Sequence, residues 1–169
     1  MACQYQSYEY IEIGSAEFEQ MVQDTLDLIE FANGDELSEW GKVRVQLGHK
    51  APFGLEYLGI GNEQWQMDNT DFFARYKIFE QRIHEKYPEI KLIGSAGPDV
   101  TSNHYTDAWE FYRKEKKNNP NFVYAIDEHY YMPPKWFLEH NDFYDNYPRD
   151  IKVFAGEYAA HDPEINIAH

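Results

Sequence analysis

Two glutamates stand directly after apolar segments that have the character of buried strands. Glu63 lies in Gly59-Ile60-Gly61-Asn62-Glu63-Gln64 after the apolar run 55–58, and Glu157 follows the apolar run 152–155. At a strand end, neighbouring groups rather than bulk water set the pKa of a carboxyl group. The pair therefore predicts paired-carboxylate chemistry, of which glycoside cleavage is the best known use.

A third polar segment, 127–131, follows another apolar run and reads Asp-Glu-His-Tyr-Tyr. If the chain stays extended here, alternation sends His129 and Tyr131 to one side and Glu128 and Tyr130 to the other. His129 then joins the two glutamates as a candidate for the site.

Other chemistries fit the sequence less well. A metal interpretation would combine His129 and Glu128 with the distant His49 or His104, but the chain has no HxH, HExxH or CxxC spacing. No Gly-x-Ser-x-Gly motif supports a Ser/His/Asp triad. No glycine-rich phosphate loop follows a strand, which disfavours nucleotide binding. We therefore expect no metal and no cofactor.

The composition bounds the class of protein. The chain has 169 residues, enough for one domain with a real core, and aromatic residues make up 17% of it. Its net charge of −15 would repel nucleic acid and anionic membrane surfaces, whereas a neutral sugar substrate is compatible with it. No apolar run approaches the roughly 20 residues of a membrane span.

The sequence does not indicate a compartment. The single cysteine, Cys3, excludes an internal disulfide, and the first residues show no basic and then apolar pattern of a signal peptide. A cytoplasmic and a secreted protein both fit.

Apolar strands alternate with amphipathic helices along the chain. Strands are expected at 55–60, 91–95, 122–126 and 151–155, with a weaker one at 9–13. Helices are expected at 15–33, 69–87, 107–117 and 134–140, and a loop between the first helix and strand 55–60.

The strand starts recur about every 30 residues, the length of one strand–helix unit in a parallel sheet. Glu63, His129 and Glu157 all follow strand ends, where the active sites of (β/α)₈ barrels converge. A complete barrel needs roughly 250 residues. We therefore expect an incomplete barrel rather than an open doubly wound sheet.

Several ordered motifs together resemble glycoside hydrolase family 51, the α-L-arabinofuranosidases. They are 61–65 (Gly-Asn-Glu-Gln-Trp), 127–131 (Asp-Glu-His-Tyr-Tyr) and 156–158 (Gly-Glu-Tyr), with support from 30–34 and 40–44. The resemblance implies that residues 1–169 are a single domain, an internal fragment of a (β/α)₈ TIM barrel with roughly strands 3 to 7. The family's β-sandwich domain would be absent.

The resemblance also implies a retaining mechanism with Glu63 as general acid/base and Glu157 as nucleophile. Their carboxyl groups should then lie roughly 5–5.5 Å apart, whereas an inverting enzyme needs about 6.5–9.5 Å. Gly59 stands where the family usually has an acidic residue, and Gln66 where glycine is commoner.

Substrate contacts follow from the same resemblance. Asn62 would contact the 2-hydroxyl of the sugar, His129 and Tyr131 would orient the sugar and the nucleophile, and Trp65 would wall the pocket. The implied partner is an arabinose-containing glycan, with the complete enzyme forming a multimer. Two alternatives stay open: an inactive or sugar-binding fragment, and another retaining glycosidase of xylanase or β-galactosidase type.

Overall fold

Four parallel strands form the centre of an α/β fold in the computed structural model, which describes residues 5–6, 9–66 and 71–161. Their order in the sheet follows the chain: β3 (Tyr57–Ile60), β4 (Lys91–Ser95), β5 (Ala125–Met132) and β6 (Lys152–Ala160). A doubly wound sheet would reverse its order at a switch point. No such reversal occurs among the four described strands, and their sequential order is compatible with the wall of a barrel.

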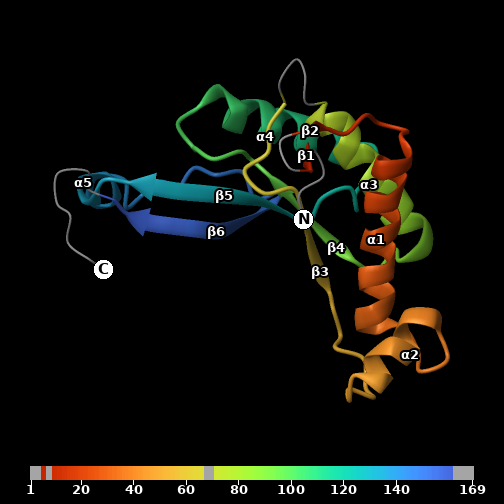
Figure 1. Ribbon diagram of the computed structural model, residues 1–169. Coiled ribbons are helices and arrows are strands. Elements are labelled where there is room, and N and C mark those ends of the chain that lie inside the picture. The colour runs from red at the N-terminus through yellow and green to blue at the C-terminus, as the bar shows by residue number, and fades with distance from the viewer. Residues whose placement is uncertain (1–4, 7–8, 67–70, 162–169) are drawn as a thin grey trace.

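Helices cover one face of this sheet (Figure 1). They are α1 (Ala16–Asn33), α3 (Phe72–Lys86) and α4 (Asn103–Lys116), while the short α2 (Glu39–Gln46) and α5 (Pro134–Glu139) lie nearer the ends of the sheet. β1 (Tyr5–Gln6) and β2 (Glu9–Tyr10) form a separate antiparallel pair. No helix within the described ranges is long and apolar enough to span a membrane.

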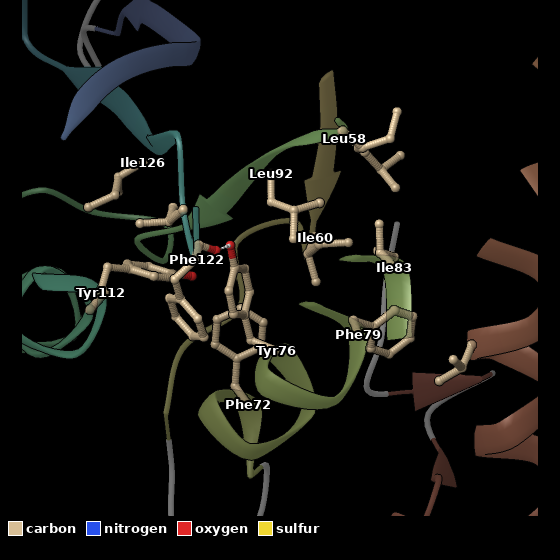
Figure 2. Packing of buried hydrophobic residues seen from close by; sticks show 14 of the residues in the cluster. Leu58, Ile60, Phe72, Tyr76, Phe79, Ile83, Leu92, Tyr112, Phe122 and Ile126 are labelled. Atoms are coloured by element: carbon tan, nitrogen blue, oxygen red, sulfur yellow. Dashed lines mark hydrogen bonds between the residues drawn. The ribbon is translucent and has the colours of Figure 1, made fainter. Parts of the chain in front are cut away.

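The core lies between α3 and the sheet (Figure 2). Phe72, Tyr76, Phe79 and Ile83 recur at helical spacing, and all four are fully buried against strand residues such as Leu92. Full burial of each such side chain stabilises the fold by about 1.5–3 kcal/mol. The one polar atom of this stripe is satisfied, because the Tyr76 hydroxyl donates to the Phe122 carbonyl at 3.1 Å.

Helix α4 packs closely on β4 because Gly94 has no side chain. A Cβ at Gly94 would lie 2.3 Å from the ring of Tyr112. The Tyr112 hydroxyl donates to the carbonyl of Ser95 at 3.2 Å, which fixes the end of β4.

The helix-covered face of β5 carries a buried carboxylate. Glu128 is fully buried and accepts hydrogen bonds from the Trp109 indole at 2.8 Å and from the hydroxyls of Tyr130 and Tyr147. Burial raises the pKa of Glu128, and these donors offset only part of that effect. The network joins β5 to α4 and so fixes which residues of β5 lie on the face away from the helices.

Most predicted elements are present, with shifted ends. Ser15 caps α1 as expected, its Oγ accepting from Phe18 N at 3.1 Å. The strands predicted at 122–126 and 151–155 begin later and run further, as β5 and β6. The helix after strand 55–60 was predicted to begin at residue 69, but residues 69–70 lie outside the described residues. Residues 1–4 at the N-terminus lie outside them as well.

Two expectations were wrong. The segment after α1 is not only a loop, because α2 forms there: Ser38 caps it, and the buried Arg44 guanidinium donates to the carbonyls of Phe31, His49 and Lys50. Those contacts come from tertiary structure and leave no periodic signal. The segment 9–13 gives only the two residues of β2, paired with β1 rather than with the parallel sheet.

A partly buried contact between His84 and Glu80 at the end of α3 predicts a pH-dependent stability. His84 Nδ1 lies 2.8 Å from Glu80 Oε1 and its Nε2 lies 2.9 Å from the Ile90 carbonyl, so both ring nitrogens face acceptors. The hydrogen bond to Glu80 raises the pKa of His84 despite the opposing effect of burial.

The protonated form of His84 is therefore favoured by folding. Its contribution is complete below the ordinary histidine pKa of about 6.5 and is lost as pH rises through the higher folded pKa. We expect His84→Gln to lower the free energy of unfolding by about 1.5–3 kcal/mol at pH 6 and by less at pH 8.5. Urea unfolding at both pH values checks this; an equal loss at both would contradict it.

Candidate active site

Glu63 sits in a tight turn just beyond β3. Gly61 and Glu63 both have left-handed backbone conformations, with φ of 84° and 50°. A Cβ at Gly61 would lie 2.9 Å from the Phe72 ring, so glycine is required there on two grounds. Glu63 is a non-glycine residue in a region that side chains seldom adopt, which marks a site held by its surroundings.

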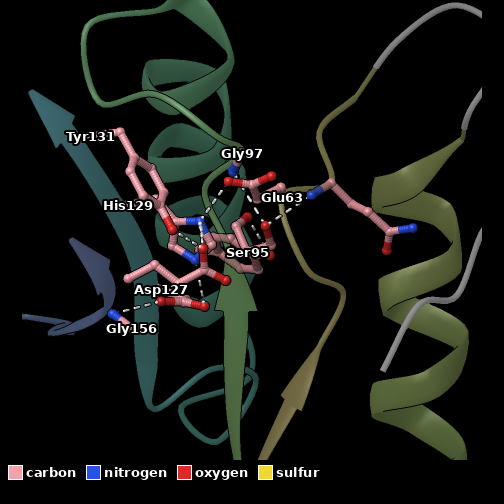
Figure 3. A network of polar contacts seen from close by, with 10 residues as sticks. Glu63, Ser95, Gly97, Asp127, His129, Tyr131 and Gly156 are labelled. Carbon is pink, nitrogen blue, oxygen red and sulfur yellow. Dashed lines mark hydrogen bonds and ion pairs between the residues drawn. The ribbon is translucent and has the colours of Figure 1, made fainter. Parts of the chain in front are cut away.

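Ser95, at the end of β4, holds this turn. Its Oγ accepts hydrogen bonds from the backbone N–H groups of Gln64 at 3.1 Å and Gly97 at 3.2 Å. Both bonds are made by one buried hydroxyl, which thereby joins the Glu63 turn to the loop after β4 (Figure 3).

Strand β5 places His129 and Tyr131 on the face away from the helices. The predicted alternation is confirmed, since Glu128 and Tyr130 bond to each other on the helix-covered side. His129 is 2% exposed and Tyr131 is 49% exposed. One side chain is thus buried within the site and the other borders solvent.

The side chains of Glu63, His129 and Glu157 meet on that face. His129 Nδ1 lies 2.9 Å from Glu63 Oε1 and 3.7 Å from Glu157 Oε2. One oxygen of each glutamate and this ring nitrogen all lie within 4.8 Å of one another. The Tyr131 hydroxyl donates to Glu157 Oε2 at 2.7 Å. Four of the six predicted site residues are therefore in one network.

Asp127 completes the network from below His129 (Figure 3). Its Oδ2 lies 3.3 Å from His129 Nε2, and its Oδ1 accepts from the Gly156 N–H at 3.0 Å. Burial raises the pKa of Asp127, and the His129 ring offsets part of that effect.

The surrounding carboxyl groups determine the protonation of His129. Burial alone would lower the pKa of the ring, but the hydrogen bond to Glu63 and the charges of Asp127 and Glu157 together raise it. The two ring nitrogens face different carboxyl groups, Nε2 that of Asp127 and Nδ1 that of Glu63. The hydrogen bond from Tyr131 to Glu157 likewise raises the pKa of Tyr131, which keeps its hydroxyl a donor.

Asn62 and Trp65 lie on either side of Glu63 along the chain. Asn62 is exposed. Trp65 is half-buried and its ring stacks on His104, with centroids 5.1 Å apart and an angle of 22° between the planes. Their contacts to a sugar stay predictions.

Sequence reasoning assigned no role to Asp127 or Ser95. Asp127 stands two residues before His129 and so shares its face of β5, which is a signal that could have been used. Ser95 is a polar residue at a strand end, like the glutamates, but its role depends on backbone groups that no pattern indicates.

The metal interpretation combined His129 and Glu128 with His49 or His104, and the structure does not bring His129 and Glu128 together in one site. Glu128 lies on the opposite face of β5, and the His49 ring stacks on Phe53 at 4.1 Å. Among the described residues, the one trio with the spacing to hold a metal ion is Glu63, His129 and Glu157. The same two glutamates are the ones that His129 and Tyr131 contact by hydrogen bonds.

Comparisons with known proteins match this chain to one family. The family model described as alpha-L-arabinofuranosidase 1 domain matches residues 4–149, which include Glu63 and His129 and end before β6. An extracellular exo-alpha-L-arabinofuranosidase of Streptomyces chartreusis is 47% identical over 82% of this chain, and alpha-L-arabinofuranosidase 1 of Arabidopsis thaliana is 37% identical over 75%.

A solved structure agrees with the sequence matches. An arabinose-bound GH51 α-L-arabinofuranosidase superposes on 89% of this chain with a TM-score of 0.63 and 26% identity. The chain spans 16% of the Streptomyces protein, 19% of the Arabidopsis protein and 22% of the solved chain. With the family model matched over most of its residues, the chain belongs to the α-L-arabinofuranosidases of glycoside hydrolase family 51.

Proposed function

We propose that this chain carries the two catalytic carboxyl groups of a retaining exo-acting glycosidase that removes terminal α-L-arabinofuranosyl residues from arabinose-containing glycans. The observation that carries the proposal is the spacing of Glu63 and Glu157. Two of their oxygens lie within 4.8 Å of each other, which is nearer to the roughly 5–5.5 Å separation of retaining enzymes than to the about 6.5–9.5 Å of inverting ones.

In the first step, Glu63 donates its proton to the leaving oxygen while Glu157 attacks the anomeric carbon. His129 Nδ1 lies 2.9 Å from Glu63 Oε1 and so holds the carboxyl group that supplies this proton. Tyr131 donates to Glu157 Oε2, so the other carboxylate oxygen is the one available for attack. Water then hydrolyses the glycosyl ester, with Glu63 accepting its proton.

We further propose that β3 to β6 correspond to the fourth to seventh strands of a (β/α)₈ barrel. The sequential strand order and the convergence of Glu63, His129 and Glu157 beyond the strand ends support this assignment. Residues 1–169 would then form one incomplete barrel domain. Asn62, Trp65, His129 and Tyr131 would line the sugar site, and the multimeric state of the complete enzyme stays a prediction.

The test is an assay of this polypeptide on aryl α-L-arabinofuranosides, β-xylosides and β-galactosides. We expect turnover of the arabinofuranoside with retention of anomeric configuration, observed by NMR of the first-formed product. Binding of arabinose without turnover would support a sugar-binding fragment, and faster turnover of another glycoside would support the other retaining class.

We predict that activity is independent of metal ions, since one oxygen of Glu63 already faces His129 and one oxygen of Glu157 already accepts a hydrogen bond from Tyr131. Dialysis against EDTA should leave the initial rate unchanged. A rate that falls on chelation and returns with one metal would contradict the prediction.

A further inference from the structure

The pairing of β5 with β6 contains an irregularity next to the site. Asp127 pairs with Phe154, but His129 pairs with Glu157. Two steps along β5 thus match three steps along β6, so β6 carries one extra residue. Such a β-bulge is rare between parallel strands and commonly redirects a side chain.

This bulge determines which way Glu157 points. In a regular ladder His129 would pair with Gly156, and Glu157 would pair with Tyr130 on the helix-covered face. The extra residue moves Glu157 into register with His129, on the face where Tyr131 donates to it. The bulge therefore determines the face of the sheet on which the Glu157 side chain lies.

The carboxylate of Asp127 fills the bulge. Its Oδ1 accepts from the Gly156 N–H at 3.0 Å, and a Cβ at Gly156 would lie 2.3 Å from that same oxygen. The backbone φ of Gly156 is not in the left-handed region, so space for Asp127 is what requires glycine there. Its other oxygen lies 3.3 Å from His129 Nε2.

We propose that Asp127 is a positioning residue that holds the β6 bulge and thereby aims Glu157 at the substrate. Asp127 acts through the Gly156 backbone and does not itself contact the reacting atoms. The role in catalysis rests on the proposed function, but the effect on strand register does not.

Crystal structures of two variants test the effect on register without any assay. Asp127→Ala removes the acceptor, and Gly156→Ala places a methyl group against it. In both we expect His129 to lose its pairing with Glu157 and the Tyr131–Glu157 hydrogen bond to break. Gly59→Ala is the matched control, because a Cβ there meets open space. Unchanged pairing in both variants would overturn the proposal.

Kinetics separate positioning from proton transfer. A dinitrophenyl arabinofuranoside needs no protonation of its leaving group, so its first step reports on Glu157 alone. Asp127→Ala should slow that step about 100-fold, as a misplacement near 1 Å does, with little change in KM.

Asp127→Asn supplies the conservative control. Its amide oxygen can still accept from the Gly156 N–H, so the dinitrophenyl substrate should react at nearly the wild-type rate. Its amide nitrogen would face His129 Nε2 and force the other tautomer, so the pH profile on a poor leaving group should change. If Asp127→Ala and Asp127→Asn slowed the reaction of the dinitrophenyl substrate equally, the positioning role of Asp127 would be overturned.

A wild-type chain without turnover would reject the proposed function, while the crystal structures would still decide the register.

Discussion

Replacing Glu157 with glutamine should lower turnover of an aryl α-L-arabinofuranoside by at least about 10⁴-fold, the scale of loss when a covalent nucleophile is removed. An amide has the same shape as the carboxylate but cannot form the glycosyl ester. The loss should be the same for good and poor leaving groups, because the first step fails in every case. Release of the aryl group measures it.

The control for this substitution is Glu17→Gln, which makes the same chemical change at an exposed position in the first turn of α1. It should keep the wild-type rate. Circular dichroism and thermal unfolding should show that both variants fold. A Glu157→Gln protein within tenfold of wild type would remove the nucleophile from the mechanism.

Replacing Glu63 with glutamine should give a loss that depends on the leaving group. General acid catalysis contributes about 10²- to 10⁴-fold, and only substrates with basic leaving groups need it. For a natural glycan or an alkyl arabinofuranoside we therefore expect the full loss. For a dinitrophenyl arabinofuranoside the first step should stay fast, while the second step lacks its base.

The signature of this Glu63 variant is a burst of dinitrophenol followed by slow turnover. Azide, a nucleophile that needs no base, should restore turnover and give the arabinosyl azide with retained configuration. A loss of equal size for every leaving group, or the absence of azide rescue, would show that Glu63 is not the acid/base.

The sequence indicated which residues meet in the site, but it did not indicate the contacts that hold them in place. Glu63, His129 and Glu157 each follow an apolar run, and parallel strands bring such ends together, so their meeting was predictable. The faces of His129 and Tyr131 followed from alternation within one strand. These inferences needed only local patterns and the topology that their spacing implies.

The register of β6 could not be predicted in the same way. Alternation along β6 alone does not show the extra residue, because a bulge exists only relative to the partner strand. Asp127 was visible in the sequence, but its role depends on that bulge. Helix α2 was missed for a related reason, since Arg44 stabilises it through carbonyls that are brought near by the fold.

The left-handed backbone at Glu63 has a consequence for how this position can evolve. A glutamate with φ of 50° carries strain that glycine would relieve, typically by about 1–3 kcal/mol. Folding and chemistry thus favour different residues at the same place. A change to glycine at this position would relieve the backbone strain but remove the carboxyl group on which the proposed mechanism depends.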